Sequence, residues 1–168
     1  NCGMRVSSAS FVILLNSDTV VSKDWDIKLL RASRESGAKV VGPLSNAASW
    51  QSVPCVVDPG TGKFAVNELV KWVSVNDMSL LCEKYCFSGQ YPIVSLLNGF
   101  CYGIRREALE AVGYFDEDSF PVGFGEEDDY SLRCADSGFR LAIATDCYVY
   151  HGKSKSFGSE RRANLAKT

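Results

Sequence analysis

The chain has 168 residues, a formal net charge of −2 and 46% hydrophobic residues. A chain of this length forms one domain that can bury on the order of 70% of its unfolded surface, so it needs no disulfide bonds to fold. Basic residues do not cluster before Arg161 and Arg162, which argues against a nucleic-acid-binding surface. The longest apolar runs, such as residues 11–15, are too short to cross a bilayer, and the first residues do not predict a signal peptide.

The seven cysteines are an odd number and include no C-x-x-C pair. Most stand in apolar or helical stretches, so we predict reduced core residues and, by default, a cytosolic compartment. Cys82 and Cys86 are four residues apart on an expected helix and could bind a metal ion, but no second pair lies near them in the sequence. The cysteines in such stretches are Cys55, Cys82, Cys86, Cys101, Cys134 and Cys147.

The first half of the chain predicts strands that alternate with a helix. Residues 11–15 form a continuous apolar run, typical of a strand covered on both faces. The polar residues 16–19 follow it, and polar loops at the carboxyl ends of such strands are frequent ligand sites. Ser22 is expected to cap a helix that ends near residue 36, and residues 39–42 predict a short strand.

Residues 43–63 are rich in Pro, Gly, Ser and Asn, and include Trp50. Irregular segments of this length in compact domains often serve function, so we predict a substrate loop. The alternative is a surface loop whose Trp50 folds back on the core. From residue 64 to residue 85, apolar side chains recur at helical spacing and predict one helix with a weak point at residues 75–77.

The second half predicts strands around a glycine turn, two helices and a final pair of strands. The expected elements are strands at 93–97 and 100–104, a helix from Arg105 or Arg106 to before Gly113, an acidic helix that ends at residues 137–138, and strands at 141–144 and 147–150. The tail beyond residue 158 is polar and is expected to fray.

The most unusual stretch is the run of four carboxylates from Glu126 to Asp129, which follows a glycine-rich loop. A helix start stabilises one or two acids through its dipole and its free N–H groups, so a solvated helix start is one interpretation. Four adjacent acids repel one another, however, and one of them is expected to have a raised pKa or a cationic partner. That arrangement also produces general bases and metal sites.

Two further polar positions lie at the ends of expected strands. Asp18 follows the first strand, and His151, the only histidine, ends the last one. Each has a structural interpretation, because Asp18 could cap its own turn and His151 could be a hydrogen-bonded residue at the core edge. An Asp and a His at one rim of a sheet can also share a divalent ion that carries phosphate oxygens.

Five segments of the chain form a recognisable series. They are residues 14–19, residues 42–48, residues 98–100 with Arg105, residues 113–117, and residues 125–130 followed by His151. In this order they resemble a family 2 glycosyltransferase of the GT-A fold. The resemblance covers residues 1–158 and implies an α/β fold with a GT-A-like (Rossmann-like) mixed sheet flanked by helices. It matches only the later part of that fold, so an N-terminally truncated domain is expected, followed by a polar tail at 159–168.

The resemblance also implies roles for individual residues. Residues 16–18 stand at the D-x-D position, where Asn16 and Asp18 bind the donor and Asp18 binds the metal ion. His151 completes the metal site. Glu127, the second acid after Gly125, is the general base that takes a proton from the acceptor hydroxyl. On the acceptor side the resemblance implies Asp128, Asp129, Trp50, Asn98 and Gly99, although Asp128 and Asp129 could also cap the helix and Trp50 could simply pack.

The implied reaction is a metal-dependent transfer of a sugar with inversion of configuration. The cofactor is Mg²⁺ or Mn²⁺, the donor is a nucleoside-diphosphate sugar, and the acceptor is a saccharide or a lipid-linked saccharide in surface polysaccharide synthesis. The expected location is the cytoplasm, with peripheral association at the inner face of the membrane as a further expectation. Two alternatives stay open: a carbohydrate- or metal-binding module without turnover, and a retaining enzyme that uses the same metal loop without the base.

Overall fold

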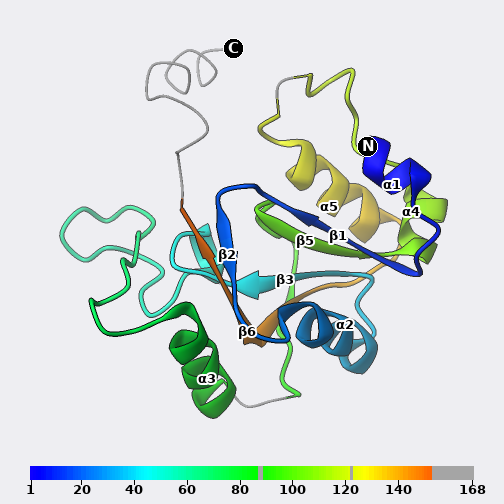
Figure 1. The fold of residues 1–168 in the computed structure, drawn as a ribbon. Coiled ribbons are helices and arrows are strands. Elements are labelled where there is room, and N and C mark those ends of the chain that lie inside the picture. The colour runs from blue at the N-terminus through cyan, green and yellow to red at the C-terminus, as the bar shows by residue number, and fades with distance from the viewer. Residues whose placement is uncertain (87–88, 122, 153–168) are drawn as a thin grey trace.

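The computed structural model describes residues 1–86, 89–121 and 123–152 and shows a mixed sheet with helices packed against it (Figure 1). The predicted α/β class and mixed sheet are therefore confirmed. The predicted tail at 159–168 and the end of the predicted domain at residue 158 lie outside the described residues.

The sheet has six strands and one parallel pair at its centre. The order is β1-β5-β3-β6-β2, and β4 pairs with β6 beside this path. Strand β3 runs parallel to β6, whereas the other pairs are antiparallel. The strands are β1 (Phe11–Leu15), β2 (Thr19–Val21), β3 (Val40–Leu44), β4 (Ile93–Val94), β5 (Cys101–Arg105) and β6 (Leu141–His151).

Alternating side chains of β6 divide the core into two clusters. Leu141, Ile143 and Tyr148 belong to a cluster with α1, α3, α4 and α5, whereas Ala142 and Val149 belong to a cluster with α2. The alternation changes phase where the register with β3 shifts between Pro43 and Leu44. The helices are α1 (Cys2–Val6), α2 (Trp25–Ser36), α3 (Val75–Tyr85), α4 (Arg106–Val112) and α5 (Glu126–Asp136), with a 3-10 turn η1 (Ser49–Gln51).

The predicted helix at 64–85 is wrong in its first half, because α3 begins only at Val75. Ser74 accepts a hydrogen bond from the Asp77 N–H while the Asp77 carboxylate accepts one from the Ser74 N–H, and this capping box defines a helix start. Before it, the Asn67 side chain exchanges hydrogen bonds with the Cys55 backbone. The apolar residues before Ser74 therefore lie on an irregular segment, not on a helix.

Four other predictions differ from the structure in their boundaries. The helix expected from Ser22 begins at Trp25, after Asp24 in a left-handed conformation. The strand expected at 93–97 is only Ile93–Val94, and the two strands expected at 141–144 and 147–150 form one strand, β6. The loop expected at 16–19 gives way to β2 at Thr19, whose pairing with β6 positions part of the candidate site.

Candidate functional site

Asp18 and His151 lie side by side because β2 pairs with the end of β6. Thr19 is opposite His151 in this antiparallel pair, and the Gly152 N–H donates to the Asp18 carbonyl at 2.7 Å. The His151 Nε2 atom is 3.5 Å from the Asp18 Oδ1 atom, and both side chains are mostly buried. The two residues that the sequence proposed as metal ligands are therefore neighbours.

Asn46, at the end of β3, fixes the backbone of His151. Its Oδ1 atom accepts from the His151 N–H at 2.7 Å, and its Nδ2 atom donates to the His151 carbonyl at 3.1 Å. The His151 Nδ1 atom is 3.4 Å from the Ala47 carbonyl. A proton on Nδ1 would make this contact a hydrogen bond and would leave the Nε2 lone pair directed to Asp18.

Phe100 supports the imidazole from its flat face. Its ring stacks on that of His151 with centroids 5.0 Å apart and planes 15° apart, and its side chain is fully buried. The Phe100 carbonyl accepts from the Asn16 N–H at 2.9 Å, which joins the loop after β1 to the same turn. The Asn16 residue itself is exposed, so its carboxamide can reach a ligand.

Glu127 contacts the same turn through the backbone of Gly99. The Gly99 N–H donates to the Glu127 Oε1 atom at 3.4 Å. A Cβ atom at position 99 would lie 3.1 Å from the Glu127 Cδ atom, so the absence of a side chain lets helix α5 come this close. Because Gly99 precedes Phe100, Glu127 and His151 flank consecutive residues of one loop.

The four acids at the start of α5 have different surroundings. Asp129 forms an ion pair with Arg133, whose Nη2 atom is 2.7 Å from its Oδ2 atom, and Asp128 is exposed. Glu126 is largely buried, and its Oε2 atom has no hydrogen-bond partner among the described residues. The expected cationic partner therefore belongs to Asp129, which leaves the carboxylate of Asp129 less available for an acceptor sugar.

We expect Glu126→Gln to raise the free energy of unfolding at pH 7. Burial, and to a smaller extent the charges of Glu127 and Asp128, raises the pKa of Glu126 above its ordinary value of 4.5, against a backbone hydrogen bond that lowers it. Glu126 therefore binds a proton more tightly in the folded state than in the unfolded state. The stability that this protonated side chain contributes is fully present below pH 4.5 and is lost as pH rises through the folded-state pKa. The neutral amide removes this loss, so urea unfolding should show a gain at pH 7 that disappears near pH 4. Asp136→Asn, at the exposed end of α5, is the control, and an equal gain at both pH values would contradict the explanation.

Trp50 and Asn98 are held by the loop that contains η1. The Trp50 Nε1–H donates to the Leu96 carbonyl at 3.0 Å, and the Asn98 N–H donates to the Gln51 Oε1 atom at 2.7 Å. Gln51 is fully buried and also donates to the Pro43 carbonyl. Trp50 is thus folded back on Leu96 and keeps 37% of its surface exposed, while the substrate role of this loop stays a prediction.

Asp18 and His151 are the side chains of the site that could bind a divalent metal ion, and such an ion would need further ligands from outside the chain. The described part of the chain contains no group of three or more Cys, His, Asp or Glu side chains arranged to bind a metal ion. Asp18 and His151 supply one carboxylate oxygen and one imidazole nitrogen, and Mg²⁺ typically takes few protein ligands together with phosphate oxygens and water. A divalent ion at these two residues would need most of its ligands from water or from a bound molecule.

The cysteines are free thiols, and most are buried. Burial raises the pKa of Cys82 to about 12 and that of Cys134 to about 11, so both are protonated at neutral pH. The prediction that Cys55 is a core residue is wrong, because the irregular loop places it at the surface.

Two residues of the site were missed in the sequence. Asn46 lies in the segment 42–48 and Gln51 in the predicted loop at 43–63, and the sequence analysis gives neither residue a role of its own. A polar amide next to a buried apolar strand was the available signal, since buried amides usually satisfy backbone groups.

Comparison with known proteins gives distant relatives. No protein-family model matches the chain. Uncharacterized proteins of Mycobacterium tuberculosis (strain H37Rv) and Mycobacterium bovis are each 28% identical to it over 167 residues. The match covers 95% of this chain but 56% of each relative, so the chain spans about half the length of the curated relatives it matches.

Proposed function

We propose that the chain is the metal- and acceptor-binding portion of an inverting glycosyltransferase with a GT-A-like fold. The observation that carries the proposal is the convergence of Asp18, His151 and Glu127 on the loop at Gly99 and Phe100. Asp18 and His151 are 3.5 Å apart, and Glu127 contacts the residue before the one that stacks on His151. The proposed transfer would use these three groups, with Asp18 and His151 at the metal ion and Glu127 as the base.

In this mechanism Asp18 and His151 hold Mg²⁺ or Mn²⁺, and Asn16 binds the donor, a nucleoside-diphosphate sugar. The ion, when bound, offsets the negative charge that grows on the leaving diphosphate. Glu127 accepts the proton of the acceptor hydroxyl as that oxygen attacks the anomeric carbon. The Gly99 N–H orients the base by donating to its Oε1 atom, which leaves the Oε2 atom for the hydroxyl.

The acceptor is proposed to be a saccharide or a lipid-linked saccharide. Trp50 offers an exposed aromatic face, and Asn98 and Asp128 lie on the two segments that meet at Gly99. Reduced thiols support a reducing compartment such as the cytoplasm.

We expect Asp18→Asn and His151→Ala each to weaken Mn²⁺ binding by more than about tenfold, since even outer partners of a metal site typically contribute 10–100-fold. Isothermal calorimetry with Mn²⁺, with and without a nucleoside diphosphate, measures this effect. Asp26→Asn, an exposed acid on α2, is the control. Unchanged Mn²⁺ affinity in both variants would refute the shared site.

The same titrations separate enzyme from binding module. Mn²⁺-dependent binding of a nucleoside-diphosphate sugar and release of the nucleotide support the transferase. The assay uses the polypeptide together with any part of it that precedes residue 1. If this protein binds a metal ion or a saccharide but turns over no nucleotide sugar, the alternative of a binding module without catalysis is favoured.

A further inference from the structure

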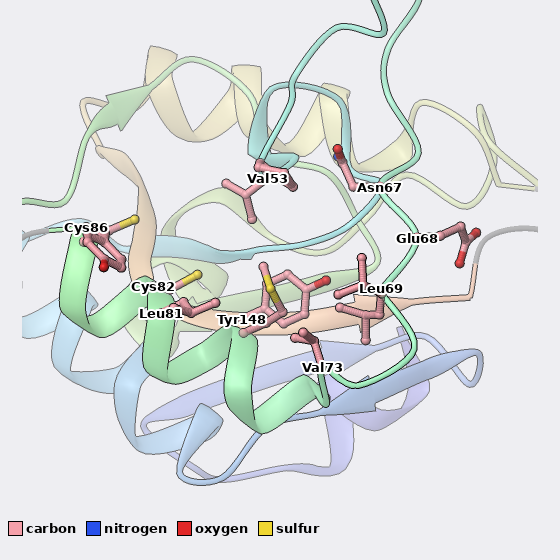
Figure 2. Close-up of a pocket in the computed structure, with 13 residues that line it drawn as sticks. Val53, Asn67, Glu68, Leu69, Val73, Leu81, Cys82, Cys86 and Tyr148 are labelled. Carbon is pink, nitrogen blue, oxygen red and sulfur yellow. The ribbon is translucent and has the colours of Figure 1, made fainter.

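An apolar pocket of about 460 Å³ lies beside helix α3, and Asp18, Glu127 and His151 are not among the residues that line it. Figure 2 shows side chains of α3 facing those of the irregular segment before it, with Tyr148 of β6 between them. Pockets of 300–1,000 Å³ are large enough for an organic ligand. The polar groups at its edge are few, mainly Asn67 and Glu68.

Five exposed apolar residues line the pocket or stand next to a lining residue in the sequence, and we call this group the α3 surface. Leu81 and Tyr85 are four residues apart on one face of α3 and line the pocket, whereas Leu80 lies next to Leu81 on the neighbouring face of the helix. Val70 lines the pocket from the other side, and Trp72 follows it. The α3 surface consists of Val70 (67% exposed), Trp72 (84%), Leu80 (61%), Leu81 (43%) and Tyr85 (66%).

Two lysines stand over the aromatic rings of this surface. The Lys71 Nζ atom is 5.1 Å from the Trp72 ring centroid, and the Lys84 Nζ atom is 5.2 Å from that of Tyr85. In the described part of the chain neither lysine forms an ion pair. Their charges are thus available to an anionic partner.

The acids near the α3 surface have partners within the fold. Glu83 pairs with Lys28, Asp77 caps α3, and the Glu68 carboxylate accepts a hydrogen bond from the Tyr150 hydroxyl. These three carboxylates each have a partner, although Glu68 and Asp77 remain exposed. Lys71 and Lys84 are the charged groups that stand over the aromatic rings of the α3 surface.

We propose that the α3 surface docks onto an anionic membrane, with lipid chains filling the pocket. Trp and Tyr prefer the boundary between headgroups and hydrocarbon, and lysines there meet anionic headgroups. None of the described helices could cross a bilayer. Docking does not depend on sugar transfer, but it would place lipid beside the site, because Asn67 at the pocket donates to the carbonyl of Asn46, which holds His151.

The test is sedimentation of the chain with vesicles of phosphatidylglycerol and phosphatidylcholine, against vesicles of phosphatidylcholine only. We expect at least fivefold tighter binding to the anionic vesicles, and quenching of tryptophan fluorescence by brominated lipid in the wild type but less in Trp72→Phe. Leu81→Ser and Trp72→Ser should each weaken binding at least fivefold. Lys71→Glu with Lys84→Glu should remove the preference for anionic lipid.

Leu132→Ser on α5, which lies away from α3 in Figure 1, is the matched apolar control, and Arg34→Glu on α2 is the charge control. Both should bind as the wild type does, and circular dichroism checks that every variant is folded. Absence of vesicle binding, or equal binding by all variants, would overturn the proposal. So would a dimer, seen by light scattering, that Leu81→Ser dissociates, because the surface would then belong to a second copy of the chain.

Discussion

Glu127→Gln is expected to reduce the rate of sugar transfer by about 10²–10⁴-fold, the range typical of a positioned general base. The amide keeps the size and the contact with Gly99 but cannot accept the acceptor's proton. Donor binding should stay within about twofold, because Asp18 and His151 are untouched. Product formation by the intact polypeptide, with Mn²⁺ and saturating donor, measures the rate, and calorimetry measures donor affinity.

Asp136→Asn is the matched control, since it removes an exposed carboxylate from the other end of α5. It should transfer sugar at the wild-type rate. Glu127→Asp, which shortens the side chain by one methylene, should fall between the wild type and the amide. Full activity in Glu127→Gln would show that Glu127 is not the general base. If NMR shows that the product retains the anomeric configuration of the donor, the inverting mechanism is wrong.

Arg31→Met is expected to lower the free energy of unfolding by about 3 kcal/mol, near the lower end of the range for breaking a buried ion pair. Its Nη2 atom donates to the Oδ2 atom of Asp146, which is fully buried in β6, and this hydrogen bond raises the pKa of the guanidinium. The Oδ1 atom has no hydrogen-bond partner in the described chain, so Asp146 has little else to compensate its charge. Because Arg31 stays 44% exposed, its own desolvation is modest, and the cost comes mainly from the stranded carboxylate.

Urea unfolding at neutral pH measures this cost. Arg34→Met, one turn further along α2 and without an ion pair in the described part, should change stability by no more than about 0.5 kcal/mol. Adding Asp146→Asn to Arg31→Met should recover part of the loss, because the amide carries no charge to strand. An Arg31→Met chain as stable as the wild type would show that the buried carboxylate is compensated in another way.

The sequence predicted elements well where the local signal and the tertiary structure agree. The apolar run of β1 was predicted with its exact bounds, and the glycine before the acids of α5 starts that helix as expected. The prediction failed at residues 64–74, where helical spacing of Val66, Leu69 and Val70 competed with contacts from distant residues. Hydrogen bonds from Asn67 to residues 46 and 55 hold this segment in an irregular path, and no local pattern reveals them.

The polar ends of strands located the candidate site, but not how it is held. Asp18 and His151 were identified from their positions at strand ends, and the four acids from Glu126 to Asp129 from the helix start. The choice of Glu127 among these acids follows only from the resemblance to family 2 glycosyltransferases. Asn46 binds the His151 backbone and Gln51 binds the Asn98 backbone, and each contact joins segments roughly 50 to 100 residues apart in the sequence. Hydrophobic periodicity reports only local structure, so it could not predict these contacts. The same limit explains why the surface position of Cys55 was not foreseen.

The parallel pair of β3 and β6 has a consequence for the order of folding. Val40 pairs with Leu141, so the chain must close a loop of roughly 100 residues before this pair forms, and long closures follow local structure. His151 reaches Asp18 only once β6 is in place. We therefore expect the proposed Asp18–His151 pair to form late in folding, after most of the helical circular dichroism signal has developed. A chain truncated before β6 should acquire secondary structure but should not form the proposed manganese site.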